Sequence, residues 1–340
     1  MIVAPNEWTE TIGPNPKRFL LYDNGPNSPH RIIVYATDEE LRVLCEVDTL
    51  FMDGTFKTSP KLFMQLYVIH SILGNTTVPT VYSYLERKNR DTYNELFTAI
   101  NNACHQRQLV FNPQNIHIDF EDAVIKAWRA VMGANRNVVC CFFHLCQNTF
   151  DHIRDLGLVD QYRDDDDFKL FCCSIDALAF LPEGDIVAGM AHLRANMPAA
   201  ALPLVNYFDQ TYVNGTVNVN GRHAPPQFPP ELWSVYEETL SGFARTNNHS
   251  EAFNLKHKLE LGHTKPTFWK SVNTIQIHQA EVATKIALAA IGDPPRKKKN
   301  LRYQRLQNRL NNLAASYSVG ALNMANYIRG VARNIRLERE

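Results

Sequence analysis

The chain has 340 residues, of which 45% are hydrophobic and 21% charged, average values that exclude a disordered, collagen-like or coiled-coil protein. The length suggests one large domain with an insertion or two smaller domains, and the apolar runs are shorter than the about 20 residues that a membrane-spanning helix needs. Seven cysteines, an odd number, make a poor disulfide framework and favour a reducing compartment.

The net charge of zero conceals an uneven distribution. Residues 294–340 carry 11 Lys or Arg against two Glu, and the first 293 residues carry 24 basic against 33 acidic side chains. We expect this basic end to form a helical surface. Its expected roles, in this order, are a nuclear-import signal, a contact for the DNA backbone, and solubility alone. A nuclear protein is therefore expected. The basic run consists of Arg296, Lys297, Lys298 and Lys299, followed by Arg302, Arg305 and Arg309.

The predicted elements begin with a lead-in rich in Pro, Asn and Gly over residues 1–44, which holds a short strand at 31–35 and a short helix after Thr37. Three strands follow, each rich in β-branched or aromatic residues, at 47–56, 63–73 and 78–85. The pattern then alternates. It predicts a helix capped by Asp91, a strand at 116–120, a helix at 123–132, a strand at 137–143 and a helix at 145–156.

The second half of the chain is predicted to be mainly helical. Its first part holds helices at 168–181 and 185–195 and a connection rich in Pro, Gly and Asn at 215–230. Further helices are predicted from Asn248 and over 267–291, before the basic end. The expected segments are a lead-in (1–44), a first α/β part (45–156), a helical insertion (157–243), a return to the core (244–291) and a basic helical region (292–340).

Three acidic residues lie at positions that suggest either a catalytic role or a local structural role. Asp53 lies within a predicted core strand, where a carboxylate is disfavoured, unless the strand ends early and Asp53 forms a turn with Gly54. Asp119 arrives as a strand finishes, although it could equally cap the next helix. Glu251 stands three residues after Asn248, which is also the spacing of a capping box.

The order β-β-β-α-β-α-β-α, followed by a helical insertion and a late acidic helix, is the layout of a ribonuclease-H-like fold. The expected fold class is therefore α/β, with a mixed sheet flanked by helices and an all-helical insertion before the last catalytic helix. In that layout the first and fourth strands are neighbours, and the late helix crosses the sheet, so the three acids can converge. Three oxygen donors suit two Mg²⁺ or Mn²⁺ ions about 3.5 to 4 Å apart, which serve phosphoryl transfer.

Six strings in order make the chain similar to the Mutator-like element (MULE) transposase domain, over about residues 17 to 335. They are MDGTFKT (52–58), KLFMQLYVIH (61–70), IHIDFEDA (116–123), CFFHLCQ (141–147), ALAFLP (177–182) and RTNNHSEAFN (245–254). The resemblance implies that Asp53, Asp119 and Glu251 form the Asp-Asp-Glu metal-binding triad of the family.

The resemblance also implies an activity. The chain is expected to be a transposase that cleaves DNA and transfers strands, acting as a dimer on transposon ends and target DNA. Cys141 and His144 match the family's Cys-x-x-His motif, where zinc is not expected because no second ligand pair is well placed. His144 is instead expected to orient a carboxylate or touch DNA. Lys57 and Arg245, next to two triad members, could contact phosphates or balance charge.

An alternative function stays open at this point. The chain could be a domesticated, non-catalytic DNA-binding or transcription-related protein, or a nuclease that does not transfer strands. Many members of the family carry a zinc-binding DNA-recognition domain ahead of the catalytic part, and only about 16 residues precede the region of resemblance here. We therefore expect a fragment, a core that borrows specificity from another chain, or a captured host gene.

Overall fold

The computed structural model describes residues 6–217, 220–242, 248–295 and 301–336. The chain forms two compact units, each built from two stretches of sequence. Unit 1 contains Met1–Val138 and Asn247–Lys298, and unit 2 contains Val139–Thr246 and Lys299–Glu340. None of the helices in the described ranges has the length and apolar character needed to cross a bilayer.

A seven-stranded mixed sheet in the order β1-β2-β5-β4-β3-β6-β7 forms the centre of the α/β fold. The strands from β1 to β3 in this order pair antiparallel, whereas β3 and β6 pair parallel. The strands are β1 (Leu20–Asp23), β2 (Ile32–Tyr35), β3 (Thr49–Thr55), β4 (Gln65–Leu73), β5 (Thr76–Leu85), β6 (Asn115–Ile118) and β7 (Asn137–Cys140). The mixed, ribonuclease-H-like sheet predicted from the order of elements is thus confirmed.

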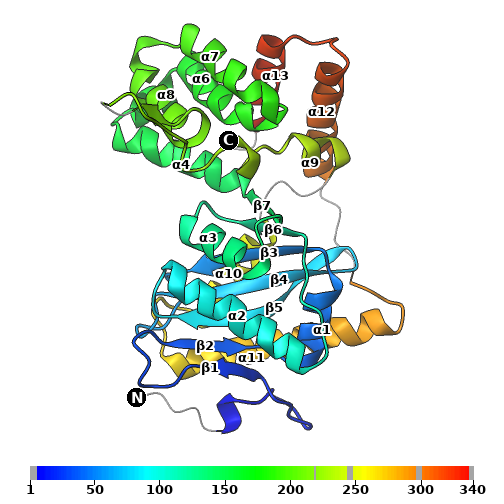
Figure 1. Ribbon diagram of the computed structural model, residues 1–340. Coiled ribbons are helices and arrows are strands. Elements are labelled where there is room, and N and C mark those ends of the chain that lie inside the picture. The colour runs from blue at the N-terminus through cyan, green and yellow to red at the C-terminus, as the bar shows by residue number, and fades with distance from the viewer. Residues whose placement is uncertain (1–5, 218–219, 243–247, 296–300, 337–340) are drawn as a thin grey trace. The chain divides into compact units, whose positions relative to one another are not determined.

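Helices cover both faces of this sheet in unit 1 (Figure 1). On one face the ring of Tyr67 in β4 packs against Tyr93 of α2, 5.4 Å between centroids, and α2 packs on α3. On the other face, Phe253 of α10 and Val272 of α11 join a core cluster with strand residues such as Tyr82. The helices of unit 1 are α1 (Asp38–Glu46), α2 (Arg90–Gln106), α3 (Asp122–Met132), α10 (Asn248–Leu261) and α11 (Phe268–Ala290).

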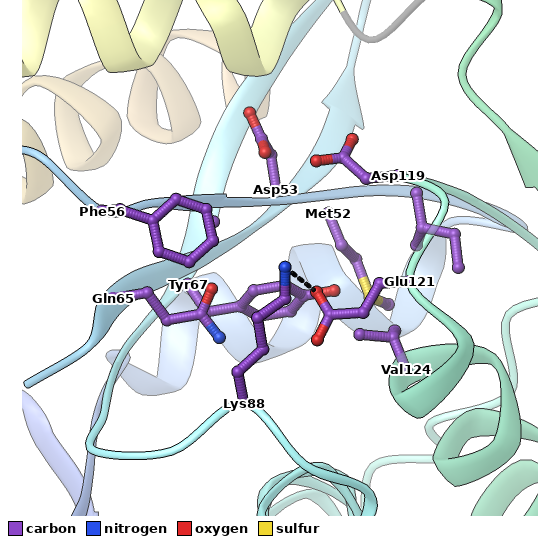
Figure 2. Close-up of a pocket in the computed structure, with 11 residues that line it drawn as sticks. Met52, Asp53, Phe56, Gln65, Tyr67, Lys88, Asp119, Glu121 and Val124 are labelled. Atoms are coloured by element: carbon purple, nitrogen blue, oxygen red, sulfur yellow. Dashed lines mark ion pairs between the residues drawn. The ribbon is translucent and has the colours of Figure 1, made fainter. Parts of the chain in front are cut away.

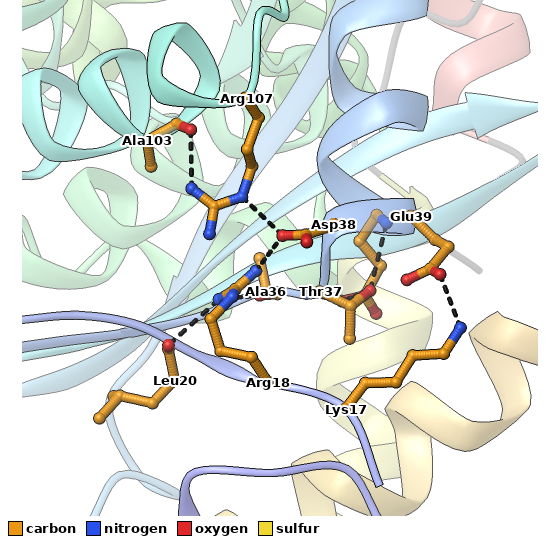
Figure 3. A network of polar contacts seen from close by, with 10 residues as sticks. Lys17, Arg18, Leu20, Ala36, Thr37, Asp38, Glu39, Ala103 and Arg107 are labelled. Carbon is orange, nitrogen blue, oxygen red and sulfur yellow. Dashed lines mark hydrogen bonds and ion pairs between the residues drawn. The ribbon is translucent and has the colours of Figure 1, made fainter. Parts of the chain in front are cut away.

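The N-terminal segment is integrated into this sheet through β1 and β2. Its polar anchor is Asp38 at the start of α1, whose Oδ1 accepts hydrogen bonds of 2.6 Å from both Arg18 and Arg107 (Figure 3). Burial acts to raise the pKa of Asp38, but the hydrogen bonds from these two guanidinium groups prevail and hold it below its usual range. The contacts tie the lead-in to the end of α2. The sequence pattern did not predict β1.

Local hydrogen bonds explain where the helices begin. Thr37 caps α1 through a capping box with Glu40, and Thr267 caps α11. Helix α2 starts earlier than predicted, because the side chain of Asn89, rather than that of Asp91, accepts the hydrogen bond from the backbone of Thr92. The predicted strand at 137–143 ends at residue 140, and its last apolar residues open helix α4 instead.

Unit 2 contains mainly helices. Its α-helices are α4 (Phe142–Asp155), α5 (Val159–Asp164), α6 (Asp166–Asp176), α7 (Ile186–Ala195), α8 (Leu202–Phe208), α9 (Tyr236–Ser241), α12 (Leu301–Ser318) and α13 (Met324–Arg336). The connection rich in Pro, Gly and Asn forms a short hairpin, β8 (Thr216–Val217) with β9 (His223–Ala224), which the helical prediction for this region had left out. The C-terminal helices pack on this region, since the hydroxyl of Tyr327 donates to the carbonyl oxygen of Phe180 at 2.6 Å.

Candidate active site at the ends of strands β3 and β6

Two aspartates occupy neighbouring positions at the ends of β3 and β6. The parallel pairing sets Phe51 opposite His117, and their rings stack with centroids 4.8 Å apart. Asp53 and Asp119 each follow this pair by two residues, and side chains in strands alternate with a period of two, so both face the side of the stacked rings. Figure 2 shows the two carboxyl groups on the same side of β3. Because neighbouring strands lie about 4.8 Å apart, the two groups are within reach of one ion.

Asp53 is part of the strand and is buried. Strand β3 continues to Thr55, so the alternative in which Asp53 forms a turn with Gly54 is wrong. The residue is only 6% exposed, and Nδ2 of Asn254 donates a hydrogen bond of 2.7 Å to its Oδ2. A buried carboxylate is unfavourable unless hydrogen bonds or opposite charge compensate it. The Asn254 amide provides part of this compensation.

Asp119 is the first residue after β6 and is partly exposed. The alternative that it caps the following helix is wrong, because the residue at the N-cap of α3 is Glu121. The backbone amide of Glu121 donates to the carbonyl oxygen of Asp119 at 2.7 Å, which forms a tight turn. The side chain of Asp119 is therefore left at the sheet edge while the backbone turns into α3.

Helix α10 lies over the side of the sheet on which the two aspartates stand. Ser250 Oγ and Nδ1 of His70 in β4 are 3.3 Å apart, and the ring centroids of Phe253 and His70 are 5.2 Å apart. Glu251, in the first turn of α10, precedes Asn254 by three residues, and residues at this spacing share one side of a helix. Glu251 therefore lies on the same side of α10 as Asn254, whose amide bonds Asp53, and is one turn nearer the beginning of the helix.

A small pocket opens where β3 and β6 end (Figure 2). Its free volume is about 10 Å³, about the space that one water molecule needs, so it is too small for an organic cofactor, and the carboxyl groups of Asp53 and Asp119 point away from Lys88 and Glu121 in Figure 2. The residues that line it include Asp53, Asp119, Gln65, Tyr67, Lys88 and Glu121.

An ion pair between Lys88 and Glu121 stands on the other side of β3 from the carboxyl group of Asp53 (Figure 2). Nζ of Lys88 lies 3.1 Å from Glu121 Oε2 and 4.9 Å from the centroid of the Phe56 ring. Burial raises the pKa of Glu121, although hydrogen bonds from Tyr93 and Lys88 oppose the shift. Since Glu121 also closes the turn after Asp119, the pair stabilises the loop that carries this aspartate.

Gly54, between Asp53 and the end of β3, leaves no room for a side chain. A Cβ atom at this position would clash with Oε1 of Gln65. Gln65 cannot easily give way, because it is fully buried and its Nε2 donates a hydrogen bond of 2.6 Å to the hydroxyl of Tyr93. The glycine thus allows a polar side chain to pack directly beneath the strand that carries Asp53.

The other predicted site residues are distributed differently. Lys57 follows β3 and is exposed, and its carbonyl oxygen accepts a hydrogen bond from the amide of Lys265. Cys141 is buried at the start of α4, and His144 is partly exposed in its first turn, so both belong to unit 2. Five predicted basic residues lie outside the described residues, namely Arg245, Arg296, Lys297, Lys298 and Lys299.

Within the ranges that the structure describes, no three or more His, Cys, Asp or Glu side chains gather into a group that could hold a metal ion. The Asp53 and Asp119 pair is a smaller group. Its donors are carboxylate oxygens only, which are the ligands that Mg²⁺ and Mn²⁺ prefer. Two carboxylates at neighbouring positions also repel each other unless a proton or a cation lies close to both. The donor chemistry of the pair therefore fits a divalent cation.

Sequence reasoning missed three residues of this site. Asn254 was detectable, because its spacing from Glu251 places it on the same side of the predicted helix. Glu121 stands just before a predicted helix, where acidic residues are common, so the sequence does not single it out. Lys88 gave no signal, since it lies in the connection between β5 and α2 and reaches the site only through the fold.

The comparison with protein families gives a match over part of the chain. Residues 49–148 match the family model of the MULE transposase domain. The match contains Asp53 and Asp119 and the first four of the six strings, which confirms the family resemblance over this range, whereas Glu251 and the last two strings lie beyond it. A search among curated proteins found no match. The match indicates a function related to transposition.

Proposed function

We propose that the chain carries the catalytic core of a DNA transposase, which cleaves DNA with the help of divalent cations and transfers the cut strand. The observation that carries the proposal is the placement of Asp53 and Asp119 at neighbouring positions on parallel strands, within the region that matches the MULE transposase domain. The substrates are transposon ends and target DNA. Because two ends must be handled together, the active form is a dimer.

In this proposal Asp53 and Asp119 hold Mg²⁺ or Mn²⁺, and Glu251 completes the set of ligands. Bound cations would make an attacking oxygen a better nucleophile and stabilise the charge on the leaving oxygen. Asn254 contributes by fixing the orientation of the Asp53 carboxylate through its hydrogen bond. The turn after Asp119 and the packing of α10 would hold Asp119 and Glu251 beside Asp53 before DNA arrives.

The same site would serve two steps of phosphoryl transfer. First, the oxygen of a water molecule attacks the phosphorus at an element end, the bond from phosphorus to the 3′ oxygen breaks, and that oxygen leaves as a hydroxyl. Second, this 3′ hydroxyl attacks a phosphodiester of the target, losing its proton, while the target's own 3′ oxygen leaves. Both steps exchange one P–O bond for another, which explains how one set of carboxylates can serve both.

The test is strand breakage in a supercoiled plasmid with Mg²⁺ or Mn²⁺. Wild-type protein should nick the plasmid, and Asp53→Asn, Asp119→Asn and Glu251→Gln should each reduce nicking by at least about 100-fold, as expected for the loss of a group that acts mainly in the transition state. Asp48→Asn is the matched control, because Asp48 is exposed at the other end of β3. It should retain wild-type activity.

Two outcomes would contradict this function. Nicking by Asp53→Asn at the wild-type rate would remove the assignment of the metal ligands. Metal-independent DNA binding by the wild type without any strand breakage would instead favour the non-catalytic, DNA-binding alternative. A strand-transfer assay with a pre-cut 3′ end separates a transposase from a nuclease.

A further inference from the structure

The last two helices of unit 2 are strongly basic and contain no acidic residue. Residues 301–336 include six arginines and neither Asp nor Glu. The arginines are Arg302, Arg305 and Arg309 in α12 and Arg329, Arg333 and Arg336 in α13. A helical pair with this composition carries its positive charge without compensation from its own sequence.

On α12, the arginines project away from the neighbouring helix α9. Arg305 and Arg309 are exposed and one turn apart. Gln307 and Asn311 each follow one of them by two residues, and Nε2 and Nδ2 of these side chains donate to the carbonyl oxygen of Thr239 at 3.3 and 3.1 Å. Two positions along an α-helix correspond to a rotation of about 200°. The side of α12 opposite its α9 contact therefore presents Arg305 and Arg309.

On α13, the arginines lie opposite the packed face. Tyr327 and Val331 are fully buried, and the hydroxyl of Tyr327 donates to the carbonyl oxygen of Phe180. Arg329 and Arg333 each follow one of these two residues by two positions and are exposed. The buried face fixes α13 to the rest of unit 2, so its arginines form a second fixed pair rather than a flexible tail.

The charge of these four arginines is not paired with an acidic side chain in the part of unit 2 that the structure describes. None of the ion pairs among the described residues involves Arg305, Arg309, Arg329 or Arg333. Arginines four residues apart on a helix are about 6 Å apart along its axis, and phosphates of one DNA strand follow each other every 3.4 Å or so along the duplex axis. Each pair therefore spans about two phosphates.

The neighbouring side chains favour a nucleic acid over a protein partner. Exposed amides accompany the arginines at Asn308, Asn312 and Asn326, and amides are common donors to phosphate oxygens. Among the described residues of α12 and α13, Leu301 is the one large exposed apolar residue; it lies one turn before Arg305 on the same side of α12, and the exposed Val319 follows the end of this helix. Protein interfaces need a buried apolar centre, which these rows do not offer.

We propose that the outward faces of α12 and α13, defined by Arg305, Arg309, Arg329 and Arg333, bind the phosphate backbone of duplex DNA. The choice of DNA rests on the proposed function, since DNA would be the substrate of the Asp53 and Asp119 site. The surface reads no base sequence. It adds affinity for any duplex, by an interaction that weakens as salt increases.

The test measures how salt changes DNA binding by the full chain. A fluorescent 30-base-pair duplex is titrated in EDTA between 50 and 200 mM NaCl, so that no cleavage occurs. The slope of log K against log[NaCl] is about −0.9 per neutralised phosphate. Replacing all four arginines with glutamine should therefore make the slope shallower by up to about 3.6, and each pair alone, R305Q/R309Q or R329Q/R333Q, by up to about 1.8.

Two controls separate this surface from general loss of charge. The double variant R42Q/K285Q removes two cations from helices of unit 1 and should leave the slope unchanged. Replacing the same four arginines with lysine keeps the charge and should restore most of the slope, because backbone binding depends on charge more than on geometry. Far-ultraviolet circular dichroism checks that each variant folds.

The result that overturns the inference is a glutamine quadruple variant whose slope equals that of the wild type. Absence of duplex binding by the wild type, or tighter binding to an acidic peptide or to RNA than to DNA, would also overturn it. Plasmid nicking by the wild type is the separate readout for the proposed function. An unchanged slope with intact, Asp53-dependent nicking would reject only the arginine surface, whereas a shallower slope without nicking would reject only catalysis.

Discussion

Replacing Asn254 with alanine tests whether α10 holds the side chain of Asp53. The hydrogen bond from Asn254 Nδ2 to Asp53 Oδ2 is 2.7 Å long, and Asp53 is 6% exposed, so water cannot readily replace the lost donor. Hydrogen bonds to charged groups contribute about 1.5 to 3 kcal/mol. We expect Asn254→Ala to lower the free energy of unfolding by this amount near pH 7.

The assay is urea unfolding followed by tryptophan fluorescence. Three of the four tryptophans, Trp8, Trp128 and Trp269, belong to unit 1, and Trp128 of α3 is fully buried and packs against Phe97 of α2. The matched control is Lys258→Ala, an exposed position on the same helix, which should change the free energy of unfolding by less than about 0.5 kcal/mol.

A double-mutant cycle with Asp53→Asn decides whether the effect belongs to this pair. Asn254→Ala and Asp53→Asn should show a coupling energy of roughly 0.5 to 3 kcal/mol. In addition, Mg²⁺ at ten times its dissociation constant should stabilise the wild type by about 1.4 kcal/mol and should stabilise Asp53→Asn less. Additive effects of the two substitutions, or a loss in Asn254→Ala no larger than in the control, would refute the reasoning.

Three further predictions concern individual residues of unit 1. Burial raises the pKa of Glu40 to about 8, so the folded state holds the carboxyl proton more tightly than the unfolded chain does. The protonated Glu40 therefore contributes stability below about pH 4.5, and this contribution is lost as the pH rises towards 8. Glu40→Gln should therefore flatten the pH dependence of the unfolding free energy, which should otherwise fall by roughly 2 to 5 kcal/mol across that window. Gly54→Ala should destabilise the fold by about 1 to 3 kcal/mol through its clash with Gln65, measured by urea unfolding; a neutral effect would show that Gln65 can move. Lys88→Met should raise the pKa of Glu121 further and make the variant lose stability with rising pH faster than the wild type, and parallel pH profiles would contradict this.

The sequence predicts the strands of the sheet well where the residue types alone favour an extended conformation. The strands around Phe51 and His70 are rich in aromatic and β-branched residues, and their positions agree with the structure to within about two residues. The neighbouring position of β3 and β6 follows from the order of elements, so Asp53 and Asp119 can be paired from the sequence alone, whereas the parallel direction of the two strands comes from the structure.

The remaining features depend on contacts that no local pattern contains. Lys88 reaches Glu121 because the connection after β5 returns to the sheet edge, and Asn24 meets Glu95 at 3.0 Å across 71 positions of sequence. The short strand at Leu20 pairs with β2, although its residues alone do not distinguish it from a loop. In these cases tertiary packing, rather than local preference, selects the conformation.

Unit 1 is discontinuous in sequence, and this has a consequence for synthesis on the ribosome. The strands that carry Asp53 and Asp119 leave the exit tunnel first, whereas helix α10, with Glu251, follows only after residues 139–246 of unit 2. At the usual 5 to 20 residues per second, roughly 7 to 26 s separate the emergence of the second aspartate from that of the glutamate. Under the proposed function, a nascent chain therefore lacks part of its set of carboxylates until α10 has emerged, and a product terminated within residues 139–246 would lack Glu251.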